Sequence, residues 1–168
     1  VIEGTLEGVN LEGLDRLNPN YVRSRVAIAA GPPLNLNELL AALQLLQQDP
    51  RIERLSAELT AGSAVAASVL NLTVEEADPF LAQVFADNGQ SPSIGSFRRG
   101  VSLGHLNLTG QGDTLEVVYS NTDGSNTVDL GYRLPFNSRN GTLELFYSRG
   151  NSWVIDESFR ILDIQTRS

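Results

Sequence analysis

Hydrophobic and polar positions follow two different periods along this chain, and only the shorter period is found beyond residue 80. Between residues 18 and 48, apolar side chains recur at the i, i+3, i+4 spacing of one helix face. On either side of that stretch they alternate with polar side chains, as in strands that bury one face. The first part therefore predicts the order β-α-α-β-β, whereas the remainder predicts only strands joined by turns.

Two helices are predicted in the first part. Asn18-Pro19 supplies an N-cap and a proline at the first helical position, and Gly31-Pro32-Pro33 ends that helix. Asn35 and Glu38 form a capping-box-like pair at the start of a second helix, which carries leucines along one face. Asp49-Pro50 ends it, because the residue before a proline is pushed out of the α region.

Three strands accompany these helices, at residues 1–12, 52–60 and 68–76. The alternation of the second strand slips once, near Arg54. The third strand alternates most cleanly, with Leu70, Leu72 and Val74 on one face. Three strands and two helices can bury one face of a sheet under both helices.

From Phe80 onward the pattern is strand, turn, strand. Asn140-Gly141 is a strong hairpin signal. Loops are expected at 121–126 and 149–153. The predicted strands span residues 81–86, 97–108, 114–120, 128–134, 142–148 and 159–167.

The late strands separate apolar residues, each set including a tyrosine, from charged ones such as Glu116, Asp129, Arg133 and Glu144. A soluble sandwich and a membrane barrel both alternate in this way. The recurring tyrosines favour a barrel, because aromatic residues form girdles at the boundary between membrane and water. The charged face would then line a wet lumen. The residues predicted to face lipid are Leu115, Val117, Tyr119, Leu130, Tyr132, Leu143, Leu145 and Tyr147.

Composition narrows the function further. The chain has 168 residues, a net charge of −8, no cysteine and one histidine. The charge argues against nucleic-acid binding, which needs a basic face. The lone His105 cannot make a catalytic triad or a two-histidine metal site. No apolar run approaches the length of a transmembrane helix, although short barrel strands need none. We expect no enzyme activity, no cofactor and no metal.

Several segments resemble a known family. Residues 31–35, 43–52 and 57–62 resemble the second POTRA domain of the two-partner secretion transporters, which include the hemolysin activators and the filamentous haemagglutinin transporters. Residues 85–89, 96–100 and 106–113 resemble the first barrel hairpin of that family, and 132–136 resembles the next periplasmic turn. The late Arg-Gly-aromatic motif of the family is not matched at Arg99-Gly100-Val101 or Arg149-Gly150-Asn151.

The resemblance implies an α+β fold, in which a POTRA-like β-α-α-β-β module at 1–79 lies in the periplasm. An antiparallel all-β meander at 80–168 would then begin a transmembrane β-barrel of the bacterial outer membrane. It implies export of a large partner exoprotein without nucleotide hydrolysis. The expected partners are the unfolded client, through its secretion-signal segment, and outer-membrane lipid, but not nucleic acid. A first POTRA domain and plug helix are expected before Val1, and further barrel strands after Ser168.

A client groove is predicted beside the strand at 52–59. If this strand is an edge, its N–H and C=O groups next to the second helix can pair with an extended client segment. Solvated surface is the simpler interpretation of the polar side chains there. The candidate groove residues are Leu40, Gln44, Gln47, Gln48, Arg51, Ile52, Arg54 and Leu55.

Two alternatives remain at this stage. A barrel-assembly factor of the same superfamily would share the architecture. A soluble secreted β-rich binding or adhesion module would instead place the late leucines and valines in a closed interior between two stacked sheets.

Overall fold

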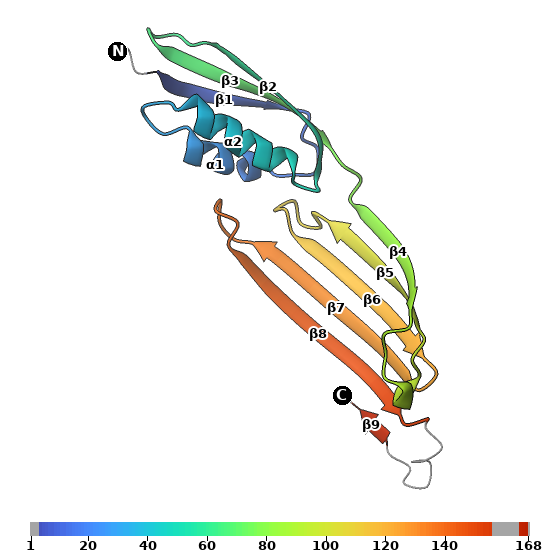
Figure 1. The fold of residues 1–168 in the computed structure, drawn as a ribbon. Coiled ribbons are helices and arrows are strands. Elements are labelled where there is room, and N and C mark those ends of the chain that lie inside the picture. The colour runs from blue at the N-terminus through green and yellow to red at the C-terminus, as the bar shows by residue number, and fades with distance from the viewer. Residues whose placement is uncertain (1–3, 156–164, 168) are drawn as a thin grey trace. The chain divides into compact units, whose positions relative to one another are not determined.

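The computed structural model describes residues 4–155 and 165–167 (Figure 1). The chain divides into two compact units. The first comprises Val1–Pro79 with two later segments, Leu106–Asp113 and Leu134–Leu143, and the second comprises the rest. No helix among the described residues is both long and apolar enough to cross a membrane.

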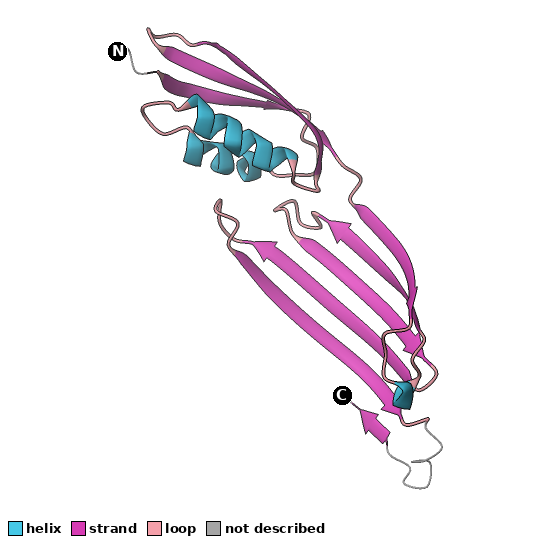
Figure 2. Cartoon of the chain, viewed as in Figure 1, coloured by secondary structure: helices cyan, strands magenta, loops and turns pink. Residues whose placement is uncertain are grey.

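The first unit is a three-stranded sheet with two helices on one face, as Figure 2 shows. β1 (Thr5–Glu12) runs parallel to the central β3 (Ala67–Glu76), and β2 (Ile52–Ala61) pairs with β3 in the antiparallel direction. The order β-α-α-β-β is the one predicted. Buried residues from both helices, β2, β3 and the loop before the first helix form one core: Leu17, Tyr21, Val22, Val26, Leu39, Leu43, Leu46, Ile52, Leu70, Leu72 and Val74.

Both helices begin at the predicted caps. In α1 (Pro19–Ala29), the Asn18 side chain accepts a hydrogen bond from the backbone N–H of Asn20. In α2 (Leu36–Gln47), the Asn35 side chain accepts from the N–H groups of Asn37 and Glu38. The Glu38 carboxylate bonds the Asn35 side-chain amide at 3.0 Å, so the reciprocal contact is made between side chains.

β2 lies at an edge of its sheet, as the predicted client groove requires, because β3 is central. The pairing with β3 shifts register between Ile52 and Arg54, where the alternation slips in the sequence. A bulge of this kind leaves an extra residue unpaired and lets the strand recover its phase. One edge of β2 therefore has no strand beside it within residues 4–155 and 165–167.

The other sheet has six strands in chain order, from β4 to β9. The residues that the structure describes here form one sheet, not the two stacked sheets that a soluble sandwich requires. A short 3-10 turn, η1 (Pro92–Ile94), lies in the polar loop after the first of these strands. The strands are β4 (Phe80–Asp87), β5 (Arg98–Leu106), β6 (Thr114–Thr122), β7 (Ser125–Pro135), β8 (Thr142–Trp153) and β9 (Gln165–Arg167).

Two predicted loops are wrong. The segment 121–126 is mostly strand, because β6 extends to Thr122 and β7 begins at Ser125. Asn121 and Asn126 pair across the ladder, and their side chains hydrogen-bond at 2.6 Å. The segment 149–153 continues β8, whose last residues pair with β9. Both segments consist mostly of polar residues that pair across strands. Because polar residues are also typical of loops, the sequence alone does not distinguish the two. Of the last predicted strand, 159–167, residues 159–164 lie outside the described residues.

Candidate functional site

Gln47 contacts the outer edge of β2. Its side-chain Nε2 donates to the Glu53 carbonyl oxygen at 3.2 Å, and its Oε1 accepts from the Leu55 N–H at 2.8 Å. These backbone groups point away from β3, because outward and inward groups alternate along an edge strand. One side-chain amide thus satisfies a donor and an acceptor that another strand would otherwise pair with.

The remaining predicted groove residues divide between the surface and the interior. Leu40 is 56% exposed, Gln44 is also exposed on α2, and Gln48 is exposed at the C-cap of that helix. Arg54 extends toward β3, where it forms an exposed ion pair with Glu75 at 2.9 Å. Leu55 packs partly against the core.

Two of the predicted groove residues do not lie in a groove. Ile52 is only 4% exposed and belongs to the core, because the bulge after it turns its side chain inward. Arg51 is held by Asp49, with Nη1 and Oδ1 3.0 Å apart and both side chains largely buried. A docked segment would find neither side chain at the surface.

Asp49 links this corner to α1. It accepts a hydrogen bond from the Tyr21 hydroxyl at 2.6 Å, and the Arg25 guanidinium lies 3.5 Å from the centre of the Tyr21 ring. Burial, and then the bond to Asp49, raise the pKa of Tyr21 to about 12. The phenol therefore stays neutral and acts as a fixed hydrogen-bond donor at the end of α2.

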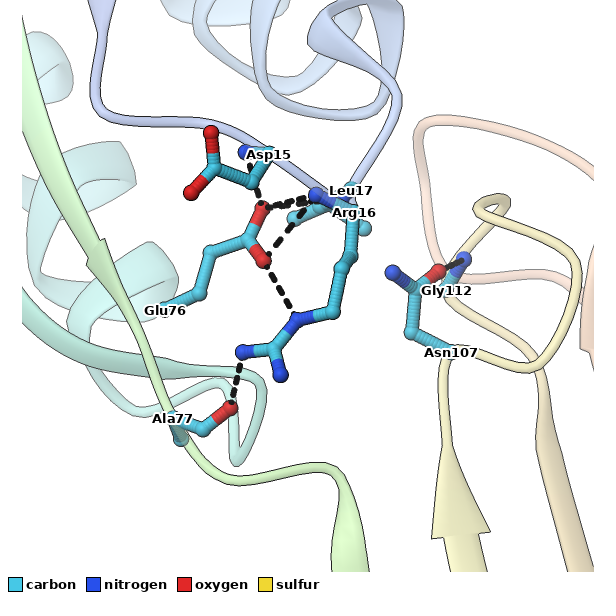
Figure 3. Close-up of polar contacts among 7 residues, drawn as sticks. All are labelled: Asp15, Arg16, Leu17, Glu76, Ala77, Asn107 and Gly112. Carbon is cyan, nitrogen blue, oxygen red and sulfur yellow. Dashed lines mark hydrogen bonds and ion pairs between the residues drawn. The ribbon is translucent and has the colours of Figure 1, made fainter.

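Glu76, the last residue of β3, holds the loop before α1 (Figure 3). Its carboxylate accepts from the backbone N–H groups of Asp15, Arg16 and Leu17 and from Arg16 Nε. Arg16 also donates to the Ala77 carbonyl oxygen at 2.8 Å. Burial alone would raise the pKa of Glu76, but these donors outweigh it and hold the pKa below its ordinary value.

The segment 106–113, which resembles the family's first hairpin, packs against α1 within the first unit. A Cβ at Gly112 would lie 2.3 Å from the Tyr21 ring, so only glycine fits there. The Gly112 N–H donates to the Asn107 side chain at 2.9 Å (Figure 3). The Asn18 N–H donates to the Gly110 carbonyl oxygen at 2.8 Å. The glycines of this segment thus serve close backbone packing.

The predicted lipid-facing residues share one face of the six-stranded sheet. Leu115 is paired with Tyr132, Val117 with Leu130 and Tyr119 with Val128. None of the eight is buried, and Leu143, Leu145 and Tyr147 are all more than half exposed. A large apolar surface left uncovered by protein marks an interaction face.

Tyr119 and Tyr132 do not lie at one level on that face. Tyr132 is level with Leu115, four residues along β6 from Tyr119, which is about 13 Å at the usual rise of a strand. Tyr119 reaches toward the turn and donates to the Asn126 side chain at 3.1 Å. These two tyrosines are therefore separated along the strands, and barrels carry aromatic girdles at both membrane interfaces.

Sequence reasoning missed the apolar residues of β4 and β5 on the same face. Ser102 bonds Glu116 on the opposite face, so its neighbour Leu103 shares a face with Leu115. Pairing in the β4–β5 ladder then adds residues such as Phe80 and Val84, both well exposed. The same period-2 alternation over 80–84 and 101–105 could have identified them.

The opposite face carries a ladder of polar contacts. The Ser102 hydroxyl donates to Glu116 at 2.7 Å, and the Ser148 hydroxyl donates to Asp129 at 2.6 Å. The Arg133 and Glu144 side chains form an ion pair at 2.6 Å. Phe146 and Leu81 are exposed apolar exceptions on this face. The described strands thus present an apolar face and a hydrated one.

Comparisons with solved structures agree with this fold. BamA from Haemophilus ducreyi, in a crystal structure lacking POTRA domains 1–3, matches 89% of the chain at 15% identity with a TM-score of 0.72. CdiB from Escherichia coli matches 90% at 22% identity with a TM-score of 0.66. CdiB from Acinetobacter baumannii matches 92% at 19% identity with a TM-score of 0.56. The chain covers only 28–30% of these structures.

The fold is thus that of a POTRA-like module followed by the first strands of an outer-membrane β-barrel. The family model for the haemolysin secretion/activation proteins ShlB/FhaC/HecB matches residues 66–162, more than half of the chain. The chain belongs to this family of two-partner secretion transporters. No curated protein matches it.

Proposed function

We propose that this chain belongs to a transporter that captures an unfolded partner exoprotein and passes it across the outer membrane without nucleotide hydrolysis. Residues 1–79 form the periplasmic module, and residues 80–168 supply the first barrel strands. Membership in the family supports a transporter. The observation that carries the finer proposal is the open outer edge of β2, beside the exposed apolar stripe of α2.

Strand addition is the mode of capture that this edge supports. Outward N–H and C=O groups of Ala57 and Leu59 can pair with an extended backbone whatever its sequence. Leu36, Leu40 and Leu59 lie exposed near them and can receive apolar side chains. An unfolded client offers both features, whereas a folded protein has its backbone groups already paired.

The six-stranded sheet supports the membrane part of the proposal. Its apolar face, with Leu115, Val117, Leu130 and Leu145 among its residues, would contact lipid, while the face with Glu116, Asp129 and Glu144 would line a water-filled lumen. Backbone groups in lipid must be paired within the protein, which a closed barrel of such strands achieves. The expected partners are accordingly a secreted polypeptide and outer-membrane lipid.

The test is a proline on the open edge. Ala57→Pro, made in the complete transporter, removes one outward N–H without removing an inward ladder bond, as edge strands tolerate. Export of the partner into the medium is expected to fall by about tenfold, since strand addition loses a hydrogen bond and meets the ring. Arg23→Ala, an exposed change on α1 outside the candidate groove, is the control, and the amount of transporter in the outer membrane is measured for both.

Unchanged export by the Ala57→Pro variant would contradict docking on β2. Intact export with reduced insertion of other barrels would favour the barrel-assembly alternative.

A further inference from the structure

We propose that the Gln47 side chain acts as a built-in stop on the β2 edge, confining strand addition to Ala57–Ala61. The inference rests on the proposed docking of an extended polypeptide at this edge. It assigns Gln47 a positioning role, which is to set where a docked strand ends.

The stop is visible in the hydrogen bonds. Gln47 donates to the Glu53 carbonyl oxygen and accepts from the Leu55 N–H, at 3.2 and 2.8 Å. An added strand would need these same two groups to continue along β2 past Ala57. It would have to displace the amide first, and a side-chain amide held at its own strand competes at high local concentration.

Beyond the stop, the edge is open and apolar. Leu40 and Leu36 lie two and three turns before Gln47, so all three share one stripe of α2. β2 runs back along the helix (Figure 1). Helix rise and strand rise together place Leu40 about level with Ala57 and Leu36 about level with Leu59. The exposed leucines therefore flank the backbone groups that Gln47 leaves unpaired.

The side-chain hydrogen bonds of Gln47 reach two of the outward groups of β2. Gln44 on the same helix face is exposed and forms no such bond there. Arg54 and Thr60 bond toward β3 instead, to Glu75 and to the Val69 carbonyl oxygen. The position of the stop is thus set by one residue, with a matched neighbour available as a control.

The first experiment needs no ligand. Amide hydrogen exchange is followed at Leu55, Ala57 and Leu59 in the whole chain, held in detergent micelles. Gln47→Ala is expected to speed exchange at Leu55 by about fivefold or more, the value of one lost hydrogen bond, and to leave Ala57 unchanged. Gln44→Ala is expected to change neither. Equal exchange at Leu55 in the parent and the Gln47→Ala variant would overturn the stop.

The second experiment uses a defined probe, a peptide of about ten alternating valine and threonine residues with arginine at each end, long enough to cover the edge. In the parent chain it is expected to protect Ala57 and Leu59 but not Leu55. In Gln47→Ala the protection is expected to extend to Leu55, and the probe to bind about fivefold more tightly. Protection that already reaches Leu55 in the parent would overturn the stop.

Gln47→Glu separates loss of the amide from loss of packing. The carboxylate can still accept from the Leu55 N–H but cannot donate to Glu53, so protection of Leu55 is expected to persist. Loss of that protection would contradict the assigned hydrogen bond. A probe with N-methylated backbone that binds as well as the parent peptide would contradict strand addition itself, and so the proposed function, while the exchange of Leu55 still decides the stop.

Discussion

The two sheets of this molecule show that one sequence pattern can occur both on a covered face and on an exposed one. β3 and β6 both alternate apolar and polar residues, yet Leu70 and Leu72 of β3 are buried under α1 and α2, whereas Val117 of β6 is exposed. The difference comes from what covers each sheet and not from the strands themselves. Alternation of apolar and polar residues along a strand indicates that one face of the sheet is apolar. Only the neighbouring elements decide whether protein or another medium covers that face.

The largest effect is expected from arginine substitutions at two adjacent residues of β8, which test whether the two faces of the exposed sheet meet different media. Leu145 and Phe146 are 59% and 73% exposed and point to opposite faces of the strand. If one face meets lipid, Leu145→Arg should lower the free energy of unfolding in lipid vesicles by about 2–4 kcal/mol near the bilayer midplane. Phe146→Arg should cost far less, because water is expected on its side. Urea unfolding of both variants in vesicles measures this, and equal losses would count against a lipid-facing side.

A smaller effect tests the helix-covered unit through Glu76, whose side chain is 8% exposed. Glu76→Gln should lower the free energy of unfolding by about 1–3 kcal/mol at neutral pH, since three backbone N–H groups and Arg16 lose their charged acceptor. The pKa of Glu76 is lowered in the folded chain, so its contribution is complete above the ordinary value of 4.5. It declines as the pH falls below that value and disappears below the native pKa.

Urea unfolding at a series of pH values between neutral and acid checks both statements. The difference between parent and Glu76→Gln should shrink toward zero on acidification. A difference that stays constant with pH would mean that the carboxylate charge is not what stabilises the loop.

The smallest effect concerns the exposed ion pair on the uncovered face of the first sheet. Arg54 and Glu75 are 2.9 Å apart, with side chains 74% and 54% exposed. Water and salt screen such a pair, so Arg54→Ala should change the free energy of unfolding by no more than about 1 kcal/mol. Thermal unfolding at low and high salt measures it. A larger loss would show that Arg54 has a role in the sheet beyond this pair.

Much of the fold could be predicted from local signals. Asn18, Asn35 and Pro50 mark helix ends, and the slip near Arg54 marks a bulge, because caps and bulges are fixed by neighbours in sequence. The burial of Ile52 and the pairing of Asn121 with Asn126 could not be predicted from local signals. Each depends on how the chain turns after a bulge or between strands.

The hydrogen bonds that define the candidate site also could not be predicted from the sequence. Gln47 contacts β2 because the last turn of α2 lies beside the start of that strand. Glu76 contacts Asp15–Leu17, about sixty residues away in the chain. No periodicity encodes either distance. The sequence does place glutamines and an acidic residue near these positions, but it does not indicate which one finds a backbone partner.

The amide of Gln47 also has a consequence for the molecule when no client is present. A long bare strand edge invites another copy of the same chain to pair with it, and such contacts can propagate into aggregates. By bonding the Glu53 carbonyl oxygen and the Leu55 N–H, Gln47 shortens the strand edge that β2 offers to a second copy of the chain. The residue that limits strand addition by a client therefore also limits self-association of the protein through β2.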